Sequence, residues 1–240
     1  MDPVSVDHAL VQAVRAGLGE IADPTKAPQM QAYMKSALPF RGVTAVPGRA
    51  LYRRLIDAHP LGSARSWQDT VRELFDHAGF REERYAALAI VRHRRYAQYR
   101  RADALPLLAH VTCTGAWWDL VDETAHAVGD VLRADRAAAE PTIRAWSTDE
   151  SLWLRRAAIL CQLGHRGDTD IALLSDAIVV NLDDPDFFVR KAIGWALRDY
   201  SKTDAVFVRD FVAAQPRLSG LSRREALKWL DRPASQGSSR

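Results

Sequence analysis

Apolar residues recur along almost the whole chain at the i, i+3, i+4, i+7 spacing that gathers them on one side of an α-helix. Trp67, Val71, Leu74 and Phe75 are a clear instance of this spacing. Almost no segment has the strict alternation of apolar and polar residues that is typical of a strand. We therefore predict an all-α protein. The predicted helices run over approximately Val4–Leu18, Met30–Leu38, Ala50–Ile56, Ser66–His77, Arg81–Tyr96, Leu105–Val111, Gly115–Leu132, Glu140–Trp146, Asp149–Gln162, Ile171–Asn181, Asp186–Tyr200, Ala205–Ala214 and Ser222–Leu230.

The helical pattern itself repeats. Residues 151–158 match residues 186–193 in character at almost every position, and the same offset of 35 leads back from Trp153 to Trp118. A period of about 35 to 40 residues with two helices per unit is typical of an α-solenoid, whose concave side is the usual binding surface. We expect about six such repeats in one domain, residues 1–231, followed by a disordered polar tail over residues 232–240.

The stretch Gly115–Glu123 stands out near the middle of the chain. Its adjacent tryptophans, Trp117 and Trp118, point roughly 100° apart on a helix and cannot both enter one core. Trp118 and Asp122 lie four residues apart and share a helix face. An indole beside a carboxylate suits a cationic or cation-developing partner. Periodicity alone favours the simpler interpretation, in which Trp118 is a core residue and Asp122 a solvated helix charge.

The repeat makes Asp122 more informative. At an offset of 35, Asp122 aligns with Ala157 and Ala192, so this unit carries a carboxylate where its neighbours carry a small apolar residue. A buried, unpaired carboxylate is costly, so Asp122 must be exposed or held by a cation. Arg156, one repeat onward, is the candidate partner.

Composition narrows the class of protein. Hydrophobic content of 48% and charged content of 26% are ordinary for a soluble globular chain, and the net charge is +3. Only five of the 33 basic residues are lysines. Arginine's planar fork suits phosphate, which gives weak support for a polyanion partner, although a generic arginine-rich surface explains the bias equally well.

Several classes of protein lack support in this sequence. Cys113 and Cys161 form no CxxC pair and are expected to be reduced. The N-terminus has no signal-peptide pattern, and no apolar run approaches the roughly 18 residues of a membrane span. Nucleotide-binding glycine motifs, HExxH and clustered His/Cys ligands are also absent from the sequence. We therefore expect a cytoplasmic or nucleoid-associated protein without a cofactor or a metal.

Five segments, in order, cover nearly the whole chain and resemble one known family. They are Met30–Lys35, Trp117–Asp122, Trp153–Leu160, Lys191–Arg198 and Leu221–Ala226. Together they are similar to the AlkD-like DNA alkylation repair glycosylases, which are built from HEAT-like helical repeats. Two departures occur beside the tryptophan pair, where Ala116 and Leu120 replace family-like serines.

The resemblance implies excision of N3- and N7-alkylated purines from duplex DNA, by a solenoid with a concave basic groove and without flipping the base into a pocket. It places Asp122 beside the deoxyribose of the damaged nucleotide. It also places Trp118 and Trp195 against the sugar and backbone. Arg156 would help to hold the phosphate, and Tyr33 would line the same cleft. Asp122, Trp118 and Trp195 are thus the candidate catalytic residues.

Further DNA contacts follow from residues beside these positions. Lys191 and Arg198 share a helix face with Trp195, while Arg223 and Arg224 open a predicted helix whose N-terminus suits a phosphate. Ser222 and Glu225 form the pattern of a capping box at that helix start. The candidate DNA-binding residues are Arg156, Tyr33, Lys35, Lys191, Arg198, Arg223 and Arg224, with Arg41, Arg94 and Arg95 as weaker candidates. The expected partner is double-stranded DNA that contains alkylated purines, bound by a monomer.

The implied chemistry needs only one carboxylate. Cleavage of an N-glycosidic bond builds positive charge on the sugar, as glycoside hydrolysis does. A purine alkylated at N3 or N7 already carries the charge that an acid catalyst would supply, so an ionised Asp122 is left to stabilise the sugar cation and orient water. The rival interpretation is a non-catalytic helical-repeat module that binds DNA structures or a protein partner. A protein-interaction scaffold is a third and weaker one.

Overall fold

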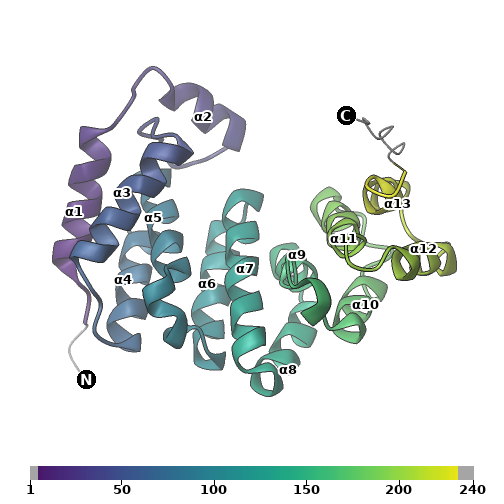
Figure 1. Cartoon of the computed structure of the whole chain (residues 1–240). Helices are drawn as coiled ribbons and strands as arrows, with labels where there is room; N and C mark the ends of the chain where they lie inside the picture. The colour runs from purple at the N-terminus through teal and green to yellow at the C-terminus, as the bar shows by residue number, and fades with distance from the viewer. Residues whose placement is uncertain (1–4, 232–240) are drawn as a thin grey trace, which may run out of the picture. The chain divides into compact units, whose positions relative to one another are not determined.

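A computed structural model of the chain describes residues 5–231. Within these residues every regular element is helical, which confirms the predicted all-α class (Figure 1). The α-helices are α1 (His8–Glu20), α2 (Ala27–Met34), α3 (Ala45–Ala58), α4 (Ala64–Asp76), α5 (Arg81–Arg92), α6 (Leu105–Gly115), α7 (Trp118–Ala134), α8 (Arg136–Trp146), α9 (Leu152–Leu160), α10 (Ile171–Val179), α11 (Phe187–Tyr200), α12 (Ala205–Ala214) and α13 (Gly220–Leu227). None of them is both long and apolar enough to cross a membrane.

Some predicted boundaries were wrong. The helix expected to run to Tyr96 ends at Arg92, and a 3₁₀ segment over Arg94–Tyr99 follows it. The helix expected from Asp149 begins only at Leu152. Helix ends are the positions that periodicity specifies least. The predicted disordered tail over residues 232–240 lies outside the described residues.

The chain divides into two compact units, one ending at Gly115 and the other beginning at Ala116. In the first unit, α3 packs on α1 and α5, and α4 packs on α5 and α6. Trp67 and Phe75 of α4 are fully buried there. Glu82 of α5 is also fully buried, and its carboxylate accepts hydrogen bonds from the backbone N–H groups of Arg41 and Val43. Short α2 contributes no buried residue to this unit.

In the second unit, α7, α9, α11 and α13 pack each on the next. Helices α8, α10 and α12 cover them, with α8 against α9 and α10, and α12 against α11 and α13 (Figure 1). This succession of helix pairs is the predicted α-solenoid arrangement. The predicted concave basic groove and the single-domain boundary at residue 231 stay predictions.

The structure corrects the predicted repeat alignment by one residue. Counted from the helix starts, Asp122, Arg156 and Lys191 are each the fifth residue, of α7, α9 and α11 respectively. The alignment of Asp122 with Ala157 and Ala192 was therefore wrong. Asp122 is equivalent to Arg156, so the two partners of the predicted pair come from the same place in neighbouring repeats.

Candidate functional site

Asp122 and Arg156 form a bidentate ion pair between α7 and α9. The Arg156 Nε lies 2.7 Å from Oδ1 of Asp122, and Nη2 lies 2.9 Å from Oδ2. The side chains of Arg156 and Asp122 are only 4% and 15% exposed. A fork-to-fork pair of this kind fixes orientation as well as adding energy, so the Asp122 carboxylate is held in one geometry. The predicted partnership between the two residues is confirmed.

Helix α11 also holds the Arg156 side chain in place. The remaining Arg156 nitrogen, Nη1, donates to the backbone carbonyl of Phe188 at 2.6 Å. Phe188 belongs to the first turn of α11, where its own N–H donates to the N-cap carboxylate of Asp186 at 2.6 Å. All three nitrogens of the guanidinium are thus engaged, and the position of Asp122 depends on α11 as well as on α9.

An aromatic cluster reaches this pair through Phe188, whose ring centroid lies 6.0 Å from Cζ of Arg156. Trp117 packs against Trp153 and Phe188 with ring centroids 6.0 and 5.3 Å apart, and Trp153 lies 5.0 Å from Phe188. Trp153 and Phe188 therefore pack against each other as well as against Trp117. Their aromatic neighbour from the tryptophan pair is Trp117, whereas Trp118, the first residue of α7, stays partly exposed and lies outside this cluster. Trp117 is therefore a supporting residue to which sequence reasoning assigned no role.

The turn that separates the two tryptophans from α6 is strained. Ala116 has φ 42°, in the left-handed region that residues with a side chain rarely adopt. Such a conformation costs on the order of 1–3 kcal/mol and persists only where its surroundings impose it. Trp117 then takes the extended N-cap conformation, and α7 begins at Trp118. The strain lies directly beside the candidate catalytic residues.

Burial dominates the electrostatics of Asp122. Desolvation raises the pKa of its carboxyl, while the hydrogen bonds and charge of Arg156 act in the opposite direction. His126, one turn further along α7, also favours the ionised form, and Asp119 disfavours it. Protonation of Asp122 would leave the permanently charged, buried Arg156 without a counter-ion, so the pair is ionic at neutral pH. His126 was missed because the histidines show no ligand spacing, although the i, i+4 relation to Asp122 was visible.

Trp195 lies between two cations on α11. Lys191 precedes it by four residues and Arg198 follows it by three, and Trp195 is partly exposed. Both cations pair with Glu225 of α13, with Lys191 Nζ 2.7 Å from Oε1 and Arg198 Nη1 at Oε2. The predicted proximity of Lys191, Trp195 and Arg198 holds, but neither cation is without a counter-ion.

The start of α13 differs from the prediction. Its N-cap is Ser219, whose hydroxyl accepts a hydrogen bond from the Ser222 N–H at 3.0 Å. Ser222 is itself buried and donates its hydroxyl to the Arg190 carbonyl at 2.8 Å. The predicted capping box between Ser222 and Glu225 was therefore wrong, because both side chains point to α11 instead.

The two arginines of α13 have different surroundings. Arg223 donates to the carbonyls of Val212 and Gln215 at 3.0 and 3.1 Å and so caps the end of α12. Arg224 is exposed. Of the two, Arg224 is the more accessible to a phosphate.

Tyr33 and Lys35 belong to the first unit. Tyr33 on α2 is 72% exposed, and Lys35 ends that helix in a left-handed conformation with φ 49°. Their membership of a site shared with Asp122 stays a prediction. The weaker candidates there include Arg41, whose guanidinium lies 3.9 Å from the centre of the Phe80 ring, and Arg95, which lies 3.5 Å from Asp57.

Comparison with known proteins gives this geometry a family. Residues 14–230 match the model of the DNA alkylation repair enzyme family. The chain belongs to that family. A solved structure described as a predicted DNA alkylation repair enzyme from Enterococcus faecalis is 30% identical, with a TM-score of 0.76. The similarity covers 88% of this chain and 98% of that one. A search of curated proteins found no match.

Membership of the DNA alkylation repair enzyme family supports a role in alkylation repair with DNA as the substrate. The Asp122–Arg156 pair and its aromatic neighbours lie inside the matched region. The arrangement presents one largely buried, immobilised carboxylate, with a partly exposed indole one turn before it on α7. The phosphate contact expected of Arg156 stays a prediction, and each of its side-chain nitrogens already donates to Asp122 or Phe188.

Proposed function

We propose that this DNA alkylation repair enzyme is a monofunctional, metal-independent glycosylase. It hydrolyses the N-glycosidic bond of cationic N3- and N7-alkylated purines in duplex DNA, without flipping the base into a pocket. The observation that carries the proposal is the buried Asp122 carboxylate, fixed by two bonds from Arg156, one helical turn from Trp118.

The chemistry explains why the carboxylate is held rigidly. As the base leaves, positive charge develops on the sugar, and a carboxylate stabilises it only if it is already in place and shielded from water. The ion pair with Arg156 supplies that order, because the two syn-oriented bonds leave the outer lone pairs of the oxygens directed away from the guanidinium. Those lone pairs are then available to the sugar cation and to the attacking water.

The leaving group needs no acid. Alkylation at N3 or N7 makes the purine cationic, so departure neutralises it without proton transfer. Trp118 and Trp195 would offer ring faces to the sugar cation and to the backbone around it. Neutral lesions such as uracil lack the stored charge and are not expected to be released.

Incubation of the protein with N7-methylguanine- and N3-methyladenine-containing duplex DNA, with mass analysis of the released bases, tests the proposal. Release of both methylated bases, and none from a uracil-containing duplex, is the expected result. Asp119→Asn is a matched control for Asp122→Asn, because Asp119 is another partly buried carboxylate of α7, three residues before Asp122. Uracil release, or full activity in Asp122→Asn, would contradict the mechanism.

A second candidate is a non-catalytic helical-repeat module that binds DNA structures or a protein partner. It is favoured by one observation, that arginine–carboxylate pairs between neighbouring repeats also occur far from Asp122, as between Arg136 and Asp170. On this alternative, Asp122 is only a structural partner of Arg156. Asp122→Asn would then tighten DNA binding by removing an anion, with no base release to lose.

A further inference from the structure

Glu225 of α13 holds two cations of α11 at once. Its Oε1 lies 2.7 Å from Lys191 Nζ, and its Oε2 accepts from Arg198 Nη1. The carboxylate side chain is 12% exposed, whereas those of Lys191 and Arg198 are 36% and 26% exposed. A recessed anion therefore lies beneath two cations that solvent reaches.

This arrangement is built into the packing of the two helices. Gly194 lies between Lys191 and Arg198 on α11, and an added Cβ there would overlap Cβ of Glu225 and fall 2.8 Å from the carbonyl oxygen of Ser222. Glycine is unfavourable inside a helix, so its presence is explained by the close approach of α13. That approach places Glu225 within reach of cations on both sides of Gly194.

The two cations flank Trp195 on the same helix. Residues 191, 195 and 198 follow the spacing of one helix face. A DNA phosphate that approached this face would meet Lys191 and Arg198 with about half of their charge offset by the single carboxylate of Glu225. Each cation keeps further N–H donors for a phosphate, but the phosphate would share the charge of each cation with the carboxylate of Glu225 and would be repelled by it.

We propose that Glu225 is an internal competitor of DNA phosphates, which lowers the affinity of the α11 face for DNA by occupying Lys191 and Arg198. The inference rests on the proposed function in taking duplex DNA as the partner. It adds an affinity-limiting residue that does not touch the reacting sugar. Weak general binding favours release of the product and search for the next lesion.

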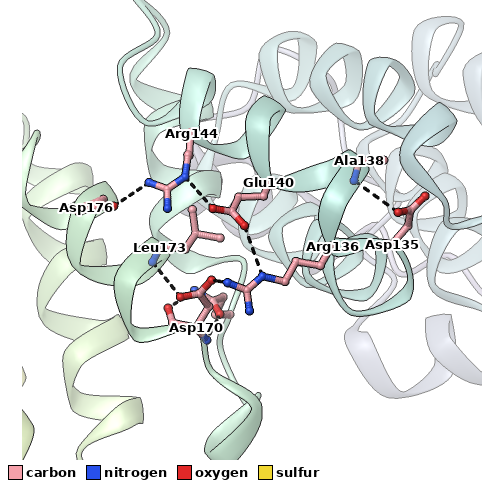
Figure 2. Close-up of polar contacts among 9 residues, drawn as sticks. Asp135, Arg136, Ala138, Glu140, Arg144, Asp170, Leu173 and Asp176 are labelled. Atoms are coloured by element: carbon pink, nitrogen blue, oxygen red, sulfur yellow. Dashed lines mark hydrogen bonds and ion pairs between the residues drawn. The ribbon is translucent and has the colours of Figure 1, made fainter.

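Helix α8 offers a matched control. Glu140 of α8 likewise accepts from two cations, Arg136 and Arg144, in the network drawn in Figure 2. Those arginines also pair with Asp170 and Asp176. Removing Glu140 therefore changes the net charge as removing Glu225 does, but leaves each freed cation with another carboxylate.

The test compares binding of Glu225→Gln and Glu140→Gln to undamaged duplex DNA over a range of salt concentrations. We expect Glu225→Gln to bind roughly tenfold more tightly at about 50 mM salt, with the log–log salt slope more negative by about 1 for each cation that binds a phosphate. Glu140→Gln is expected to stay near wild type. Adding Lys191→Gln to Glu225→Gln should reverse much of the increase in affinity, and the loss should be larger than the loss that Lys191→Gln causes when Glu225 is present.

Affinity of Glu225→Gln that equals that of Glu140→Gln, or falls below wild type, overturns the inference. Thermal unfolding of each variant shows whether the fold is retained, and Glu225→Asp, which keeps the charge on a shorter side chain, serves where Gln does not fold. Base release measured in parallel separates the two proposals. Release by wild type without tighter binding by Glu225→Gln refutes only the role of Glu225. Tighter binding by a protein that releases no base refutes only the glycosylase.

Discussion

Two arginine–carboxylate pairs in the second unit join neighbouring repeats across the same span of sequence, and they differ in the burial of the arginine. Arg156 and Asp122, 34 residues apart, are 4% and 15% exposed. Arg136 and Asp170, also 34 residues apart, are 59% and 9% exposed, and Figure 2 shows them in a wider network with Glu140. In the second pair Asp170 also caps α10 through the Leu173 N–H. Identical chemistry at identical spacing therefore serves cohesion in one place and a candidate active site in the other.

What distinguishes the Asp122 pair is the loss of water around its arginine. Arg156 has no solvent-facing nitrogen to spare, because Phe188 takes the third one. The ring of Phe188 lies 6.0 Å from Cζ of Arg156 and packs against Trp117 and Trp153. Low local polarity strengthens the interaction of each charge with a third group, which is why we propose that Asp122 acts on the developing cation.

The largest expected difference between the two pairs is in the free energy of unfolding that is lost with the arginine. Arg156→Gln leaves the Asp122 carboxylate buried without its cation, and should lower the free energy of unfolding by about 3–5 kcal/mol. Urea denaturation followed by circular dichroism measures the loss. A loss below about 1 kcal/mol would show that Asp122 reaches solvent without Arg156.

The next largest effect is expected in the pH dependence of base release, which should follow the ionisation of Asp122. Base release requires ionised Asp122, whose pKa burial raises above the ordinary value of 3.8. Release from prebound DNA should fall by about tenfold per pH unit once the pH drops below that raised pKa. The same direction means that protonation of Asp122 favours the folded state at low pH, and this contribution is lost as the pH rises through the raised pKa. Single-turnover rates that stay constant down to pH 3.8 would contradict the assignment.

Asp186 tests whether the start of α11 positions Arg156 through the backbone of Phe188. Asp186→Ala removes the N-cap of α11 and frees the Phe188 peptide that anchors Arg156, so it should cost about 1 kcal/mol of stability and also slow base release. Asp204→Ala removes an equivalent N-cap from α12 and should cost similar stability without slowing release. Equal release rates in the two variants would exclude a positioning role for Asp186.

The smallest effect is expected at the pair of Arg136 and Asp170, whose arginine is exposed. Arg136→Gln should change stability by about 1 kcal/mol or less, because Arg136 is solvent-screened and Asp170 keeps its capping bond to Leu173. Base release should be unchanged. A loss as large as that of Arg156→Gln would mean that burial is not what distinguishes the two pairs.

Much of the fold could be predicted because the spacing of apolar residues identifies amphipathic helices. The helix around Trp67 and the repeat that relates α9 to α11 follow from that spacing alone. The Asp122–Arg156 contact was predictable for the same reason, since a repeat places equivalent residues side by side. The one-residue error in alignment arose at Ala116 and Trp117, where a left-handed turn sets the start of α7.

The contacts of α13 could not be predicted in this way. Glu225 fits a capping-box pattern in the sequence, and only the close packing of α13 at Gly194 directs it to Lys191 and Arg198. Local spacing also assigned Trp118 to the same row as Trp153 and Phe188, although Trp117 is the residue that packs there. Both errors concern side-chain direction, which depends on tertiary packing that a local pattern does not contain.

The rate of base release from N7-methylguanine duplex DNA by Asp122→Asn, under single-turnover conditions with DNA binding measured alongside, tests the central claim most directly. The account predicts a loss of about 100-fold to 1,000-fold, with DNA affinity close to that of wild type. The Asp170→Asn variant should release the base at the wild-type rate. Release by Asp122→Asn at the wild-type rate would contradict the account.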